Sequence, residues 1–130
     1  SVMDLVAYSS HLETGYLGKL GEHRGKWKKR FCILKDAYLY WFKSHKNEET
    51  NLGCVNAGNC HLTVSETAVR KEEYVFVVTE RQTLKTINFS APSLEERDKW
   101  VAALEKITAK PAAASKKQLE NLRHRSQTYS

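Results

Sequence analysis

The strongest chemical signal in this sequence is a run of basic residues between Lys26 and Arg30 that leads directly into an apolar run ending at Leu34. From Lys19 to Arg30 the chain has six Lys or Arg residues and one acidic residue, Glu22, a net charge of +5 out of +6 for the whole chain. The six are Lys19, Arg24, Lys26, Lys28, Lys29 and Arg30. Ammonium and guanidinium groups at this density favour an anionic partner, because they form charge-assisted hydrogen bonds with phosphate and carboxylate oxygens.

A β-strand must position these charges. Successive side chains of a strand point to opposite faces, so Lys28 and Arg30 share one face with Cys32 and Leu34. The basic pair therefore lies at the outer end of a strand whose continuation is buried. Residues 21–25 contain two glycines around polar residues, which predicts a hairpin tip just before this strand.

Seven short strands are predicted between Thr14 and Ser90, because β-branched and aromatic runs alternate there with turn residues. They are residues 15–20, 27–35, 38–43, 52–56, 60–64, 74–79 and 84–90. After Pro92 the apolar period changes, and Ser93 with Glu96 matches a capping box, which predicts the start of a helix. Its apolar stripe consists of Trp100, Val101, Leu104 and Ile107. A helix of about 15 residues is about 22 Å long and can cover one end of a small barrel.

Four motifs in this order resemble a pleckstrin homology (PH) domain. They are GYLGKL (residues 15–20), WKKRFCILKD (27–36), LYWF (39–42) and the helix residue Trp100. The resemblance implies a mainly β fold, a seven-stranded antiparallel barrel or sandwich capped by one C-terminal amphipathic helix. The domain organisation that we expect is a lead-in segment (residues 1–13), a PH domain (14–109) and a flexible basic tail (110–130).

The resemblance also implies a ligand and a site. PH domains that bind 3-phosphorylated inositides place a lysine of the first strand and a K-x-R pair of the second around the phosphates, and Lys19, Lys28 and Arg30 match them. Trp41 matches a phosphate-contacting tyrosine, although its indole can only donate. His23 matches a further basic residue of the first loop. These two departures, Trp41 and His23, argue against high affinity and against strict selectivity for 3-phosphates, but not against headgroup binding as such. The implied phosphoinositide site is Lys19, His23, Arg24, Lys28, Arg30 and Trp41.

Three classes of function fit these patterns. The first is a non-catalytic PH domain that binds phosphoinositides and recruits a larger signalling or adaptor protein from the cytoplasm to an intracellular membrane surface, as a monomeric domain. The second is a protein-binding scaffold of the same fold with weak or no lipid specificity. The third is binding of single-stranded nucleic acid, which ranks last because stacking needs exposed aromatic rings and the strand alternation buries several of them.

Neither an enzyme nor a cofactor or metal site is expected. Five histidines lie far apart without paired Cys or carboxylate spacing, which argues against a metal site. Three cysteines without a C-x-x-C pair favour a reduced, intracellular setting. No apolar run approaches the roughly 20 residues of a membrane-spanning helix. In the tail, Arg123 three residues before Ser126 resembles a site for basophilic kinases.

Overall fold

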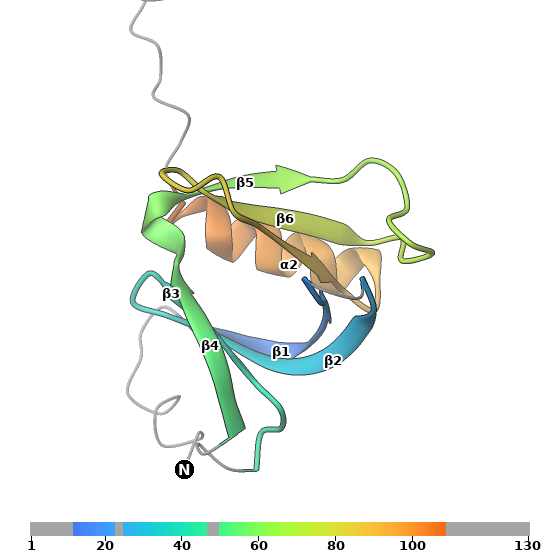
Figure 1. Ribbon diagram of the computed structural model, residues 1–130, viewed down its shortest axis with the longest axis horizontal. Coiled ribbons are helices and arrows are strands. Elements are labelled where there is room, and N and C mark those ends of the chain that lie inside the picture. The colour runs from blue at the N-terminus through green and yellow to red at the C-terminus, as the bar shows by residue number, and fades with distance from the viewer. Residues whose placement is uncertain (1–11, 23–24, 47–49, 109–130) are drawn as a thin grey trace, which may run out of the picture.

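A single antiparallel sheet of seven strands, followed by one α-helix, makes up the described part of this chain (Figure 1). The computed structural model describes residues 12–22, 25–46 and 50–108. The elements are β1 (Leu12–Leu20), β2 (Trp27–Lys35), β3 (Tyr38–Phe42), β4 (Asn51–Asn56), the 3₁₀ helix η2 (Ala57–Asn59), β5 (Cys60–Val64), β6 (Val75–Glu80), β7 (Thr86–Ser90) and α2 (Leu94–Glu105). The predicted fold class is confirmed.

The sheet is ordered β4-β3-β2-β1-β7-β6-β5 and curls around the helix. In Figure 1, β1 and β2 lie on one side of α2, and β5 and β6 lie on the other. In this arrangement the apolar stripe of the helix packs against the concave face of the sheet, so each element buries the apolar surface of the other. The predicted role of the helix as a cover for the strands is therefore correct.

The helix begins as the sequence predicts. Ser93 is its N-cap, and the Ser93 hydroxyl oxygen accepts a hydrogen bond from the Glu96 backbone N–H at 3.1 Å. Trp100 and Leu104 of the predicted stripe are fully buried. The helix has 12 residues, somewhat fewer than predicted, and ends at Glu105, so Ile107 of the predicted stripe lies beyond it.

The last strand, β7, begins later than predicted. The predicted alternation from Leu84 to Ser90 holds only from Thr86, where β7 begins. Leu84 has a positive φ of 60° and is 69% exposed. The Leu84 N–H donates to the Glu80 carbonyl oxygen and the Glu80 N–H donates to the Lys85 carbonyl oxygen, each at 2.9 Å, so these residues close a turn. β1 in turn starts at Leu12, within the segment predicted as a lead-in.

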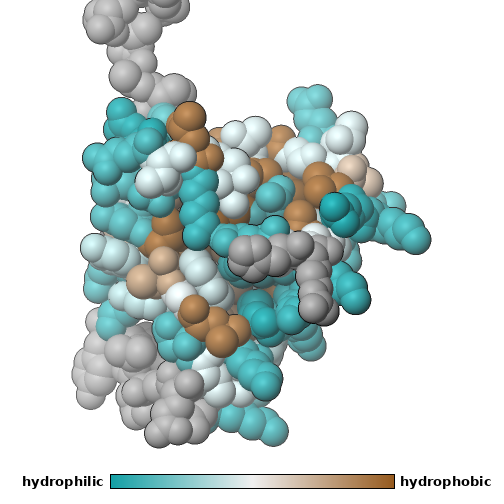
Figure 2. All heavy atoms as spheres, in the orientation of Figure 1, coloured by the Kyte–Doolittle hydropathy of each residue, from teal (hydrophilic) through white to brown (hydrophobic). Residues whose placement is uncertain are grey.

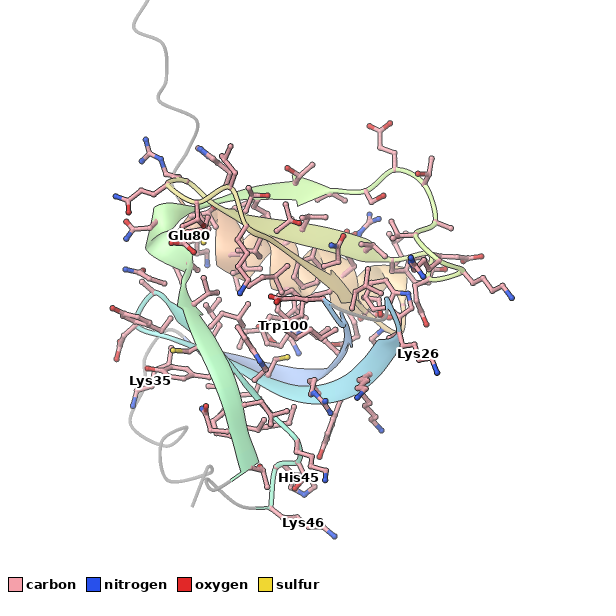
Figure 3. The ribbon with its side chains drawn as sticks, viewed as in Figure 1. Lys26, Lys35, His45, Lys46, Glu80 and Trp100 are labelled. Atoms are coloured by element: carbon pink, nitrogen blue, oxygen red, sulfur yellow. The ribbon has the colours of Figure 1, made fainter. Side chains whose placement is uncertain are left out.

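Two contacts join β1 to the helix α2. A Cβ atom on Gly15 would lie 3.7 Å from the indole nitrogen of Trp100, an ordinary van der Waals distance, so the ring lies directly beside this strand. An ion pair between Lys99 and Glu13, 3.0 Å long, joins the helix to the same strand. Figure 3 shows Trp100 in the interior of the molecule, whereas Lys26 points outward near the start of β2.

Candidate anion-binding site

The pairing of β1 with β2 brings the predicted basic residues together. Lys19 of β1 lies opposite Lys28 of β2, and Leu17 lies opposite Arg30. Because side chains alternate along each strand, the three basic residues share the face that carries buried Leu17. Lys29 points to the other face, where its ammonium lies 4.7 Å from the centre of the Tyr16 ring. The predicted separation of Lys29 from its two neighbours is therefore present.

Trp41 lies on the same face and supports Lys19. Trp41 is opposite Cys32 in the register of β2 and β3, and the Lys19 ammonium is 5.0 Å from the centre of its ring. The ring also packs edge to face on Phe89. On β4, a Cβ on Gly53 would lie only 2.6 Å from the Trp41 ring, so the glycine makes room for the indole. Trp41 is thus a packing residue and, at the same time, a cation–π platform for Lys19.

The electrostatic state of Lys19 shows that positive charge is crowded here. Burial lowers the pKa of Lys19, and the nearby cations Lys85 and Arg30 lower it further, whereas Glu22 acts in the opposite direction. The charged form of Lys19 is therefore less favourable in the folded protein than in water. A bound anion would offset the free-energy cost of desolvating Lys19 and would reduce the repulsion between the cations.

Lys85 is a cation at this site that the sequence did not reveal. It lies in the connection between β6 and β7, and its ammonium is 2.8 Å from a carboxylate oxygen of Glu22. The pairing of Lys19 with Phe89 places β7 beside β1 and so brings this connection next to the β1–β2 turn. Because residues 84–90 were predicted as a strand, Lys85 was not predicted to lie at this site. We name Lys19, Lys28, Arg30 and Lys85 the basic cluster.

The remaining predicted residues cannot be placed. His23 and Arg24 lie outside the described residues, as do the predicted kinase site at Ser126, the whole predicted tail (110–130) and residues 1–11 of the predicted lead-in. Across residues 12–22, 25–46 and 50–108, no three His, Cys, Asp or Glu side chains gather as metal ligands. No helix in these ranges is long and apolar enough to cross a membrane.

One face of the molecule is mainly hydrophilic. In the face shown in Figure 2, polar residues dominate and apolar residues appear in small groups. The large apolar side chains that are exposed in the described chain lie on separate elements: Tyr38, Leu52, Leu84 and Leu94. This face therefore offers charge rather than a large apolar patch to a partner.

Comparisons with known proteins agree with this geometry. A sequence model of the PH domain matches residues 13–109. Kinesin-related protein 1 of Dictyostelium discoideum is 32% identical over 94 residues, which are 72% of this chain and 4% of that protein. Interactor protein for cytohesin exchange factors 1 of Homo sapiens is 33% identical over 79 residues, which are 61% of this chain and 17% of that protein. The chain thus corresponds to a small part of these relatives.

Solved structures show the same fold. The C-terminal PH domain of pleckstrin, in complex with D-myo-Ins(1,2,3,4,5)P5, is 25% identical with a TM-score of 0.62, and the match covers 75% of this chain and 97% of that one. The same pleckstrin domain determined to 2.1 Å is 27% identical with a TM-score of 0.62. With the sequence model covering most of the chain and this shared fold, the chain belongs to the PH domain family.

Proposed function

We propose that this domain binds polyphosphorylated inositol headgroups through the basic cluster and thereby recruits the protein that contains it from the cytoplasm to a membrane surface. One observation carries the proposal: Lys19, Lys28 and Arg30 share one face, where Lys19 is partly desolvated and lies near the cations Arg30 and Lys85 as well as the Glu22 carboxylate. The pleckstrin domain of the same fold is solved with an inositol pentakisphosphate, which supports the same class of ligand here.

Arg30 is the residue on which the site depends most. Its planar guanidinium can hold two phosphate oxygens at once from a rigid strand. In the structure it donates an exposed hydrogen bond to the Lys29 carbonyl oxygen at 3.2 Å, which a phosphate oxygen can replace. Lys19 and Lys28 then add single ammonium donors beside it, and Lys85 can join them once its pairing with Glu22 is exchanged for a phosphate.

The magnitudes show why specific contacts are needed. A net charge of +5 near an anionic membrane gives at most about 5 kcal/mol, at about 1 kcal/mol per basic side chain, which corresponds to a dissociation constant of about 0.2 mM. Each charge-assisted contact with a phosphate adds about 1.5–3 kcal/mol. Two or three such contacts bring the expected affinity into the micromolar range or tighter.

The test compares two liposome preparations of equal surface charge. One carries a polyphosphorylated inositide and the other carries phosphatidylserine. We expect the wild-type chain to prefer the inositide liposomes, and Arg30→Ala to lose this preference with a drop of roughly 10- to 150-fold in affinity. Lys29→Ala is the matched control, because Lys29 is one residue away but lies on the other face.

Two outcomes would contradict the proposed site. If the wild type binds both preparations equally, or if Arg30→Ala and Lys29→Ala weaken binding to the same extent on both, general attraction is sufficient and the proposed site is wrong. Melting curves followed by circular dichroism verify that both variants fold, which we expect because neither side chain fills the core.

A further inference from the structure

A second concave surface lies on the opposite, outer side of β1 and β2. It has a volume of about 440 Å³, within the roughly 300–1,000 Å³ of ligand pockets in general. Its walls come from β1, β2, the β5–β6 connection and the start of the β7–α2 connection. We call it the outer groove, and its main lining residues are Tyr16, Gly18, Trp27, Lys29, Glu72 and Pro92.

The floor of the outer groove depends on a glycine. Gly18 pairs with Ser90, and these two positions mark one end of the short ladder between β1 and β7. A Cβ on Gly18 would collide with the Ser90 hydroxyl oxygen and would approach the Trp27 ring to 3.5 Å. Because residue 18 has no side chain, the surface is hollow at this point.

The wall of the outer groove is held by two long-range hydrogen bonds. The Trp27 indole N–H donates to the Val69 carbonyl oxygen at 3.3 Å, and the Arg70 guanidinium donates to the Gly25 carbonyl oxygen at 3.1 Å. Both bonds tie the β5–β6 connection to the start of β2. A groove whose walls are fixed in this way loses little conformational entropy when a ligand binds.

The charges of the outer groove differ from those of the basic cluster. The lining carries the cation Lys29 and the anion Glu72, and it also includes Lys28 of the basic cluster, so its net charge is +1. The rest of the lining is mostly aromatic or apolar, including Trp27 and Pro92. A headgroup with several phosphates would meet the Glu72 carboxylate and few cations. A ligand with one or two carboxylates and an apolar side chain fits better.

We propose that the outer groove binds an acidic, extended segment of a partner protein, with an apolar side chain packed between Trp27 and Pro92 and a carboxylate paired with Lys29. A second copy of this chain is a poor occupant, because each chain carries a net charge of +6 and the copies repel one another. The inference goes beyond headgroup binding, since it uses the other face of the same two strands.

A peptide selection tests this proposal. A phage-displayed library of random dodecapeptides is selected on the full chain, and the most enriched peptide is synthesised and titrated while the Trp27 indole N–H resonance is followed by NMR. We expect enriched peptides to combine Asp or Glu with one large apolar residue and to shift this resonance. Lys29→Glu should weaken binding by about tenfold or more.

Lys46→Glu is the matched control, because Lys46 is exposed on the β3–β4 connection and the charge change is identical. It should leave peptide affinity within about twofold of the wild type, since it adds no charge to the groove. Equal weakening by Lys29→Glu and Lys46→Glu would contradict the proposal, as would the absence of acidic, apolar peptides among those selected. If inositol hexakisphosphate displaces the peptide from wild type but not from Lys29→Glu, the groove is a phosphate site and the proposal is wrong. Lys28 lines the outer groove and also belongs to the basic cluster, so the test changes Lys29, which is not part of the basic cluster.

Discussion

The two halves of β2 differ in what surrounds them. At the start of the strand Lys28 is exposed and Arg30 is half-buried, whereas Cys32 is fully buried and Leu34 is only 2% exposed. Four residues of a strand span about 13 Å, so a single strand passes from solvent to core within that distance. The residues that stabilise the fold and those that we propose to bind a ligand are therefore different residues of the same strand.

Burial also acts differently on charge at the two ends. It raises the pKa of the Cys32 thiol to about 12, so this group stays neutral and packs as an apolar side chain. Beside the other end of β2, on β1, burial lowers the pKa of Lys19, but the ammonium remains partly solvated and lies over Trp41. The core therefore excludes charge, whereas the basic cluster retains charge at a free-energy cost that an anionic ligand can offset.

The largest expected effect is the loss of stability caused by a substitution in the core. Trp100→Ala should lower the free energy of unfolding by about 3–5 kcal/mol, because it leaves a cavity where a fully buried indole packs on Gly15. Chemical denaturation followed by circular dichroism measures the loss. Trp100→Phe should cost less, since the Trp100 indole N–H has no hydrogen-bond partner within the described structure. A Trp100→Ala variant as stable as the wild type would contradict the account.

Lys19→Met should weaken ligand binding without lowering the stability of the fold. It removes a cation that faces the proposed ligand, so headgroup affinity should fall by roughly 10- to 150-fold. The free energy of unfolding should stay the same or rise, because the variant removes a partly desolvated charge beside Arg30 and Lys85. Calorimetric titration and denaturation of the same sample measure both quantities. Loss of stability without loss of affinity would reverse the roles that we assign to the two ends.

The pH dependence of Lys19 follows from its lowered pKa. Between that lowered value and the ordinary lysine pKa of about 10.4, the unfolded chain binds more protons than the folded one. The contribution of Lys19 to the free energy of unfolding therefore rises with pH through this window. The difference in stability between wild type and Lys19→Met should shrink accordingly as pH increases. A difference that grows over this range would show that the pKa of Lys19 is not lowered.

The smallest expected effect concerns the acidic residue in the basic cluster. Glu22→Gln removes the carboxylate that pairs with Lys85, so that Lys85 is available to phosphate. The pair is about half exposed, and such pairs are worth at most about 1 kcal/mol, so headgroup affinity should increase by no more than about fivefold. Surface plasmon resonance on inositide liposomes can detect this change. A decrease in affinity would mean that Glu22 positions the site rather than competing with the ligand.

Much of the fold could be predicted because local patterns and tertiary packing agree in it. β2 and β5 begin and end where the alternation predicts, and the helix starts at the predicted cap, Ser93. Leu84 shows where such reasoning fails. Its type and spacing favour a strand, but the turn hydrogen bonds of Glu80 hold it outside the ladder with a positive φ. A periodic pattern cannot reveal which residue closes a turn.

The candidate site was predictable only in its local part. Lys28 and Arg30 are two residues apart on one strand, so their common face follows from the period of a strand. The arrival of Lys85 depends on the pairing of β1 with β7, between residues some 70 positions apart in the sequence. The outer groove depends on the same pairing, together with the bond from Trp27 to Val69. Neither contact leaves a pattern in the sequence.

The most direct test of the division between the two ends is an NMR titration of the full chain with soluble D-myo-Ins(1,2,3,4,5)P5. We expect saturable shifts of the Lys19, Lys28 and Arg30 amides and of the Trp41 indole, with the Trp100 indole unchanged. In Arg30→Ala these shifts should require roughly 10- to 150-fold more ligand. The absence of saturable shifts, or shifts that are as large at Trp100 as at Trp41, would contradict the account.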